Sequence, residues 1–241
     1  MIASRITIVE ETGSTNADLI AALRAGERLG EGAWHVARRQ SAGRGRQGRE
    51  WFDGSGNFMG SSLVALRPQD PAPASLSFVA GLAVYDTVVE ALSGTTVTPS
   101  LKWPNDVLLG PAKLSGILLE MVHGHVIVGI GVNLARAPDL PDRATAAIAD
   151  FSHAPDLSWF ARRLSEHFAV RLETWRHAGL AQTLDEFQLC SIHGPGTPVA
   201  VHDQDGSVIE GSFEGLDETD GALRLRLADG SQRVIRAGDI V

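Results

Sequence analysis

The chain has 241 residues, 44 % of them hydrophobic, which suits one mid-sized domain with a hydrophobic core and a small appended domain. Its 29 acidic residues outnumber its 21 basic ones, and the formal net charge of -8 argues against a general affinity for nucleic acid or anionic membranes. The single cysteine excludes an intramolecular disulfide, the N-terminus shows no signal pattern, and Gly, Asp or His interrupt the apolar stretches, so we expect a cytoplasmic protein without a membrane span.

The first quarter of the chain predicts a strand, a helix and two further strands. Residues 4–10 alternate as a strand does, and residues 14–25 place apolar side chains at helical spacing. The pattern Thr15-x-x-Asp18 has the spacing of a capping box, which would make Thr15 a helix cap. Strand patterns return at residues 33–38 and 57–66.

The middle of the chain predicts one core helix and then a run of strands. Ser75 opens a helix whose apolar residues recur at 3.6 spacing, so this face should pack on a sheet. The turn His123-Gly124 should join the last two strands of the run. These strands are expected at residues 97–103, 107–109, 113–122 and 126–133.

The last third predicts helices followed by a small all-β domain. Amphipathic helices are expected at residues 157–177 and 180–189. Beyond a segment rich in Gly and Pro, short alternating strands separated by Gly and Asp turns favour a small β-barrel docked on the rest of the chain. We therefore expect a catalytic domain at residues 1–190 and a C-terminal barrel at residues 191–241.

A loop rich in Gly and Arg follows the second strand and has the G-x-G-x-x-G spacing of dinucleotide-binding folds. That fold needs a helix after the motif, whereas here a strand follows, and a single copy in an acidic chain argues against an RNA-binding segment. We interpret the loop as a mobile anion-binding segment, because arginine forks match phosphate and carboxylate oxygens at ~1.5 to 3 kcal/mol for each charge-assisted bond. Its candidate residues are Gly43, Arg44, Gly45, Arg46 and Arg49.

Lysine is scarce, since Lys102 and Lys113 are the only two among the 21 basic residues. Where arginine is the default, a retained lysine suggests that a compact ammonium is needed. The turn at residues 101–106, which contains Lys102, either bonds its own backbone or presents Asn105 and Asp106 toward a cleft.

Two glycines in one strand, Gly129 and Gly131, form a second candidate wall of the same cleft. Glycine weakens a strand unless a ligand or another backbone must approach closely. The strand then ends at Asn133.

Together these segments resemble the biotin protein ligase family in order and spacing. The resemblance covers most of the chain, and no single motif would suffice. It implies an α+β fold, with a core similar to class II aminoacyl-tRNA synthetases and a small C-terminal β-barrel, in a form without the N-terminal DNA-binding domain that some members carry. One departure is Ser115, where the family often has glycine. The segments are Ser14-Thr15-Asn16, the Gly/Arg loop with Trp51, residues 102–106, Lys113 to Gly116, and Gly129 to Asn133.

The resemblance implies an enzyme that uses ATP to activate biotin as biotinyl-5′-AMP and transfers it to a lysine of a biotin carboxyl carrier protein of acetyl-CoA or related carboxylases. Lys113 would supply positive charge where the biotin carboxylate meets the α-phosphate, with Arg44 and Arg46 as further catalytic residues on a closing loop. Mg²⁺ would be held mainly by the phosphates. DNA and membranes are not expected partners, and the protein could form a homodimer.

The remaining candidate residues bind the two small substrates. The ureido ring of biotin has one carbonyl acceptor and two N–H donors, so its pocket needs mixed polar side chains. By resemblance Trp51 would stack on adenine, while three polar residues would line the phosphate side. The biotin set is Ser14, Thr15, Asn16 and Gln40, the phosphate set is Asn105, Asp106 and Asn133, and Gly116 and Gly129 belong to the walls.

Two other functions are weighed against this one. A lipoate protein ligase would share the fold and the adenylation chemistry, but its pocket would need apolar room for a dithiolane. A biotin-sensing or scaffolding protein would need neither Lys113 nor the loop arginines. Cys190 is interpreted as a core thiol, and a metal site at His123 and His125 is disfavoured because neither has a carboxylate or cysteine as a direct sequence neighbour.

Overall fold

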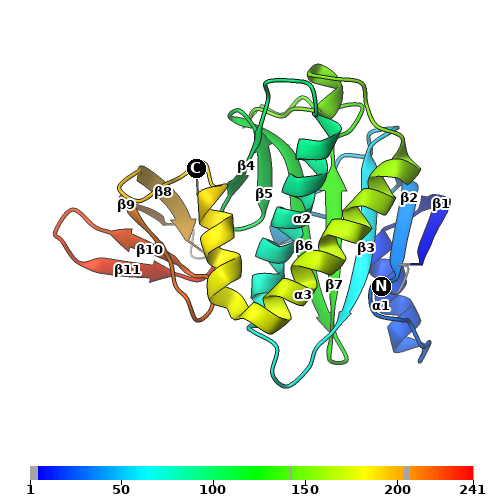
Figure 1. The fold of residues 1–241 in the computed structure, drawn as a ribbon, viewed down its shortest axis with the longest axis horizontal. Coiled ribbons are helices and arrows are strands. Elements are labelled where there is room, and N and C mark those ends of the chain that lie inside the picture. The colour runs from blue at the N-terminus through cyan, green and yellow to red at the C-terminus, as the bar shows by residue number, and fades with distance from the viewer. Residues whose placement is uncertain (1–4, 142, 204–206, 241) are drawn as a thin grey trace.

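The computed structural model describes residues 5–141, 143–203 and 207–240, and its strands form two separate sheets (Figure 1). The larger sheet has seven strands in the order β1-β2-β3-β7-β6-β5-β4, with β1 and β2 parallel and the other neighbours antiparallel. A mixed sheet with packed helices confirms the α+β class. The strands are β1 (Ile6–Thr12), β2 (Trp34–Gln40), β3 (Phe58–Ala65), β4 (Pro99–Lys102), β5 (Asp106–Leu109), β6 (Ala112–Val122) and β7 (His125–Val132).

Helices cover both faces of the large sheet. In Figure 1, α2 and α3 cross one face of it. The other face carries α1, because Leu19 and Leu63 share a small separate core whereas the next residue, Val64, belongs to the main core under α2 and α3. Successive strand side chains point to opposite faces, so this alternation assigns a face to every residue of the strand. The helices are α1 (Thr15–Arg24), α2 (Leu76–Ala91) and α3 (Leu157–Leu189), with 3₁₀ turns at Arg46–Gly48, Pro73–Ser75 and Ile148–Asp150.

The two helices expected at residues 157–177 and 180–189 are the two parts of α3. Gly179 interrupts the helical backbone between them, with φ 84 and ψ -179. Asp156 begins the first part, because its carboxylate accepts hydrogen bonds from the backbone N–H groups of Ser158 and Trp159.

Residues 73–91, which contain α2, are long and apolar enough to cross a bilayer by length and composition alone. The expectation that polar interruptions exclude such a segment is therefore corrected for this helix. Most of the segment is buried against the sheet and α3, so its apolar character is that of a core helix. The search of the described residues finds no second helix of this kind.

The C-terminal strands form a five-stranded antiparallel sheet in the order β11-β10-β9-β8-β12. Within the described residues the outer strands β11 and β12 do not pair with each other, so the sheet is open and the expected closed barrel is not found. The sequence pattern did not indicate β12, which has only three residues. The strands are β8 (Pro198–Asp203), β9 (Val208–Leu216), β10 (Leu223–Arg226), β11 (Gln232–Ile235) and β12 (Gly238–Ile240).

The small sheet is docked on the large domain, as expected for a domain of this size. Trp103 donates its indole N–H to the carbonyl oxygen of Gly221 over 3.1 Å. Leu101 of β4 also forms a parallel bridge with Ser191, which lies just after α3. The turn that carries Trp103 is therefore held by both domains.

Candidate active site

One elongated pocket of about 1050 Å³ lies on the α1 face of the large sheet and extends to the C-terminal sheet. It brings together nearly all of the residues that the sequence singled out. Gly43 is the exception, since it does not line the pocket, and a β-carbon there would lie 3.1 Å from both the Gln40 amide nitrogen and the Trp51 carbonyl oxygen. Those that line the pocket are Ser14, Thr15, Asn16, Gln40, Arg44, Gly45, Arg46, Arg49, Trp51, Asn105, Asp106, Lys113, Gly116, Gly129 and Asn133.

Glycines form the floor of this pocket. Gly131 of β7 pairs with Gly116 of β6, and the Trp51 indole lies directly over both of them. A β-carbon at Gly131 would overlap the indole, and one at Gly116 would come within 3.0 Å of it. Gly129 holds Asn16 in the same way, because a β-carbon there would overlap the Asn16 carboxamide. The absence of side chains at these three positions therefore lets Trp51 and Asn16 reach the sheet.

A chain of buried hydrogen bonds orders the pocket end beside α1. Gln40 Oε1 accepts from the Thr15 N–H over 2.7 Å, and the Thr15 and Ser61 hydroxyls lie 2.7 Å apart. Ser61 Oγ donates to Asn16 Oδ1 over 2.6 Å, and Asn16 Nδ2 donates to Glu120 Oε2 over 2.7 Å. These bonds fix both amide orientations, so the ends of each amide are not interchangeable.

Thr15 does not cap its helix. Ser14 occupies the N-cap position and makes no side-chain capping bond, while the Thr15 hydroxyl bonds Gln40 and Ser61. The capping-box expectation for Thr15 is therefore wrong, because its backbone N–H bonds Gln40 and its hydroxyl bonds Gln40 and Ser61. Ser61 and Glu120 were missed by the sequence analysis, although a polar residue inside an apolar strand is a usable signal.

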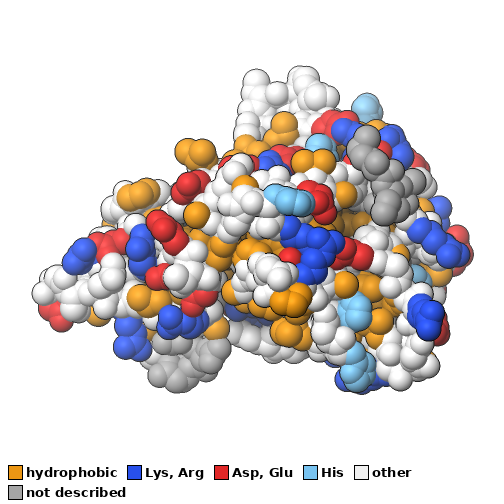
Figure 2. Space-filling model, turned by 60° about the horizontal axis from the view of Figure 1, so that its bottom comes forward, with side chains coloured by type: hydrophobic (Ala, Val, Ile, Leu, Met, Phe, Trp, Pro, Cys, Tyr) orange, Lys and Arg blue, Asp and Glu red, His pale blue; other side chains and the backbone are white. Residues whose placement is uncertain are grey.

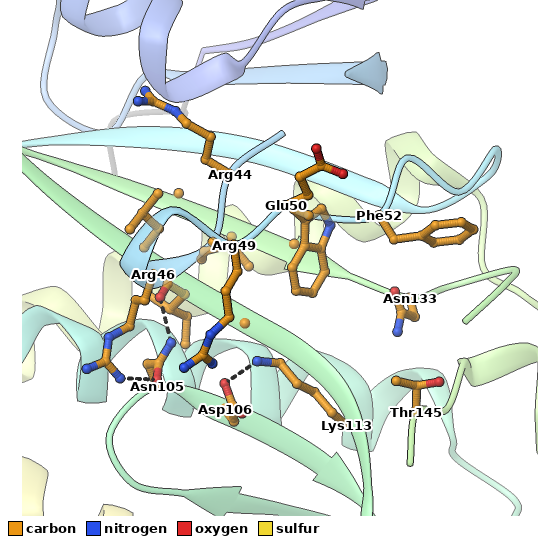
Figure 3. Close-up of a pocket in the computed structure, with 18 of the residues that line it drawn as sticks. Arg44, Arg46, Arg49, Glu50, Phe52, Asn105, Asp106, Lys113, Asn133 and Thr145 are labelled. Atoms are coloured by element: carbon orange, nitrogen blue, oxygen red, sulfur yellow. Dashed lines mark hydrogen bonds and ion pairs between the residues drawn. The ribbon is translucent and has the colours of Figure 1, made fainter. Parts of the chain in front are cut away.

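Lys113 and Asp106 form an ion pair at the centre of the pocket. Lys113 Nζ donates to Asp106 Oδ1 over 2.7 Å, and the ammonium lies 6.0 Å from the centre of the Trp51 ring (Figure 3). Both side chains are about one-fifth exposed, at 20 % and 19 %. The expected charge is thus present, partly desolvated and open to a ligand.

The Gly/Arg loop reaches across the pocket to the C-terminal sheet. Arg46 Nη1 donates to Asn105 Oδ1 over 2.8 Å and to Asp239 Oδ1 over 2.9 Å. Arg49 Nη2 donates to Asp239 Oδ2 over 2.6 Å, while Arg44 lies 3.5 Å from Glu120. Burial alone would raise the pKa of Asp239, but the Arg49 hydrogen bond and both arginine charges hold it below its usual value. Nothing in the sequence of the C-terminal domain pointed to Asp239.

The two asparagines expected on the phosphate side lie at different places. Asn105 Nδ2 donates to the Ile117 carbonyl over 2.9 Å, so this turn is tied to β6 and does not merely bond itself. Asn133 is buried, and its amide donates to the Ala146 carbonyl over 3.1 Å. In Figure 3, Asn133 lies on the side of Phe52 and Thr145, away from Asn105.

Charge outside the pocket is mixed. On the face drawn in Figure 2, basic side chains are interspersed with acidic ones, and the described residues visible there form no extended basic surface.

Comparisons with known proteins identify the family of the chain. Residues 14–134 match the model of the biotin/lipoate A/B protein ligase family, and residues 196–241 match that of the biotin protein ligase C-terminal domain. A biotin ligase for acetyl-CoA carboxylase from Paracoccus denitrificans is 40 % identical, over 97 % of this chain and 98 % of that one. Its counterpart from Mycobacterium tuberculosis is 36 % identical, over 98 % of this chain and 88 % of the relative.

Solved structures show the same fold. The biotin protein ligase from Aquifex aeolicus in complex with biotin and ATP superimposes with a TM-score of 0.83 at 24 % identity, covering 98 % of this chain and 97 % of that one. The Leishmania major enzyme in complex with biotinyl-5-AMP has a TM-score of 0.65 at 26 % identity, covering 97 % of this chain and 99 % of that one.

Proposed function

Since the chain belongs to the biotin protein ligase family, we propose that its pocket activates biotin with ATP as biotinyl-5′-AMP and that the enzyme transfers biotin to a lysine of a biotin carboxyl carrier protein. The observation that carries the proposal is one pocket with a hydrogen-bonding end at Asn16 and a cationic centre at Lys113. The names of the relatives indicate the carrier of acetyl-CoA or a related carboxylase. They do not favour the alternative, a lipoate protein ligase.

Biotin would lie with its ureido ring at the α1 end. Ser14, Thr15, Asn16 and Gln40 are all buried there, and the hydrogen bonds from Thr15 to Gln40 leave the Gln40 amide N–H₂ free to donate to a ureido carbonyl. A polar site that hydrogen-bonds its ligand discriminates against a ligand without those groups, which favours biotin over lipoate.

Adenylation brings together two anions, and electrostatics decides its rate. A carboxylate oxygen of biotin forms a bond to the α-phosphorus of ATP, and the bond from that phosphorus to pyrophosphate breaks with its electron pair leaving on the pyrophosphate. Lys113 is the group that would lower the repulsion, because its ammonium is partly desolvated and held in place by Asp106. The acceptor lysine then attacks the anhydride carbonyl as a neutral amine: the C–N bond of the amide forms, the acyl C–O bond breaks with its electron pair leaving on AMP, and the amine releases a proton to solvent.

The arginine loop would protect the reactive anhydride. Arg46 and Arg49 are held by Asp239, so an arriving phosphate can draw them inward by offering the same charge. Arg44 starts from its position beside Glu120. Trp51, already flat against the glycine floor, would stack on adenine, and closure would exclude water from the intermediate.

Mg²⁺ would enter with ATP. Among the described residues, no group of three or more His, Cys, Asp or Glu is placed to hold a metal ion. Asp106 supplies hard oxygen donors beside Lys113, which suits an ion held mainly by phosphates. Bound there, the ion would neutralise phosphate charge.

The test is pyrophosphate release by the purified protein with biotin, ATP and Mg²⁺, followed by labelling of a biotin carrier domain. We expect both, and we expect lipoate in place of biotin to give neither. Activity with lipoate alone would overturn the assigned substrate, and biotin binding without pyrophosphate release would favour a sensing or scaffolding protein.

The same proposal includes the organisation of the chain. We assign catalysis to residues 1–190 and an accessory role to residues 191–241, whose sheet supplies Asp239 to the pocket. The similarity of the core to class II aminoacyl-tRNA synthetases is part of the same proposal. The proposed compartment is the cytoplasm, where a single unpaired cysteine such as Cys190 is ordinary.

A further inference from the structure

The second lysine of the chain also lines the pocket. Lys102 is the last residue of β4, and its neighbour Leu101 is buried on the opposite face, where it packs near Gly81 of α2. Because side chains alternate along a strand, Lys102 faces the side of the sheet that carries the pocket, and it is half-buried there.

Lys102 differs from the other pocket cations described above in its partners. Lys113 is paired with Asp106, Arg46 and Arg49 with Asp239, and Arg44 with Glu120. No carboxylate of a described residue forms an ion pair with Lys102. Burial lowers the pKa of Lys102, and the charges of Asp106 and Asp239 only partly compensate. A half-buried ammonium with this environment would be stabilised by an anionic ligand.

The order of residues across the sheet indicates which part of the ligand would meet Lys102. Asn16 lies over Gly129 of β7, Lys113 lies on β6, Asp106 on β5 and Lys102 on β4. Three strand spacings, about 14 Å, separate β7 from β4. A line from the biotin end therefore passes Lys113 first and Lys102 afterwards.

The in-line geometry of phosphoryl transfer indicates on which side of Lys113 the pyrophosphate leaves. The attacking oxygen and the leaving oxygen lie on opposite sides of the reacting phosphorus. If the biotin carboxylate approaches from the side of Asn16 and meets the α-phosphate at Lys113, pyrophosphate departs away from Asn16, toward β4. Burial and the Lys102 charge lower the pKa of nearby His193, which disfavours the charged form of that histidine.

We propose that Lys102 binds the β- and γ-phosphates of ATP and the pyrophosphate that they become. This inference rests on the proposed adenylation. It assigns the two lysines to different groups, Lys113 to the reacting centre and Lys102 to the leaving group. Negative charge builds up on the leaving oxygen as the bond to the α-phosphorus breaks, and an ammonium at that position stabilises it.

The first experiment compares Lys102→Ala, Lys102→Gln and Lys102→Arg with the wild type. We expect the alanine and glutamine variants to raise the inhibition constant of pyrophosphate and the KM for ATP by about 10- to 100-fold, as for loss of one charge-assisted bond. Arginine should restore part of the effect. Transfer of biotin from supplied biotinyl-5′-AMP to the carrier should be unchanged, because that step uses no pyrophosphate. Arg162→Ala is the matched charge control, since Arg162 lies exposed on α3, across the sheet from the pocket.

A second measurement uses the wild-type protein and the scarcity of lysine. Acetylation of surface amines followed by mass spectrometry reports on Lys102 and Lys113 separately. We expect inorganic pyrophosphate with Mg²⁺ to protect Lys102 from acetylation. This readout stands even if a variant folds poorly.

Two results would overturn the proposal: Lys102 acetylated at the same rate with and without pyrophosphate, or Lys102→Gln losing transfer from supplied biotinyl-5′-AMP as strongly as it loses adenylation. Either result would leave the proposed function intact if the wild type still releases pyrophosphate with biotin. A wild type that releases none would instead defeat the proposed function itself.

Discussion

Arg46 Nη1 lies 2.9 Å from Asp239 Oδ1, although 193 positions separate the two residues in the chain. The contact joins the arginine loop to the last strand of the C-terminal sheet. The loop is therefore held over the pocket by the C-terminal domain before any ligand arrives.

Replacing Asp239 with Asn should release the arginine loop. The carboxylate accepts from Arg46 and Arg49 together, so neutralising it removes both ion pairs. We expect backbone amides of residues 43–50 to exchange hydrogen faster in the ligand-free variant, by roughly tenfold for each 1.4 kcal/mol lost. Hydrogen exchange followed by mass spectrometry measures this. Asp229→Asn, in an exposed turn of the same domain, should leave the loop unchanged, and equal exchange in both variants would contradict the assigned role.

Lys113→Ala should lower the adenylation rate by about 10² to 10³, the cost of removing one donor that stabilises a developing negative charge. Biotin affinity measured by calorimetry should change little, because the hydrogen-bonding residues beside α1 lie apart from Lys113. Rapid-quench measurement of pyrophosphate formation tests the rate. A rate close to that of the wild type would remove Lys113 from the mechanism.

The glycine floor predicts that two alanine substitutions affect different substrates. Gly131→Ala would push the Trp51 indole off the floor and should raise the Kd for ATP by about tenfold, as for overpacking at 1–3 kcal/mol. Gly129→Ala would displace Asn16 and should raise the Kd for biotin instead. Calorimetry with each ligand separates the two. Gly30→Ala is the control, because a side chain there meets nothing; identical losses for both ligands in both variants would contradict this division of the pocket.

The Glu31 carboxylate should make a pH-dependent contribution to the free energy of unfolding. Its carboxylate accepts from Arg176, which is only 3 % exposed, and from the Ala65 N–H. Burial alone would raise the pKa of Glu31, but the Arg176 hydrogen bond and charge lower it below 4.5 overall. The stabilisation is therefore complete above pH 4.5 and is lost as the pH falls through the lowered folded-state pKa.

Glu31→Gln should accordingly reduce the free energy of unfolding by about 1–3 kcal/mol near neutral pH, the usual cost at a hydrogen-bonded charged group. The difference from the wild type should shrink below pH 4.5. Urea unfolding at a series of pH values measures it. Glu218→Gln, at an exposed turn, serves as the control, and a difference that stays constant down to strongly acidic pH would rule out titration of Glu31 as the cause.

Local patterns in the sequence predicted most of the secondary structure, because they are set by short-range periodicity. The apolar face after Ser75 became α2, and the break between residues 177 and 180 is the interruption at Gly179. The closed barrel was not found, since alternation identifies strands without saying whether the first and last of them pair.

For the site, the sequence identified the ligand-facing residues better than their partners. Lys113 and Asp106 belong to short motifs that lie close together in the sequence, so their contact could be expected from the sequence. Asp239 and Glu120 pair with arginines that are distant in the sequence. The residues around a single carboxylate in a strand do not indicate which cation it will contact. Thr15 shows the same limit, because its capping role was overridden by Ser61 and Gln40 from other strands.

The alternation of side chains along β7 places core-packing residues and pocket-lining residues on opposite faces of one strand. Val126, Val128, Ile130 and Val132 face the helical core, while Ile127, Gly129, Gly131 and Asn133 face away from it. Changes at Gly129, Gly131 and Asn133, which line the pocket, should therefore act on substrate binding, whereas changes at Val126, Val128 and Val132, which do not, should act on stability.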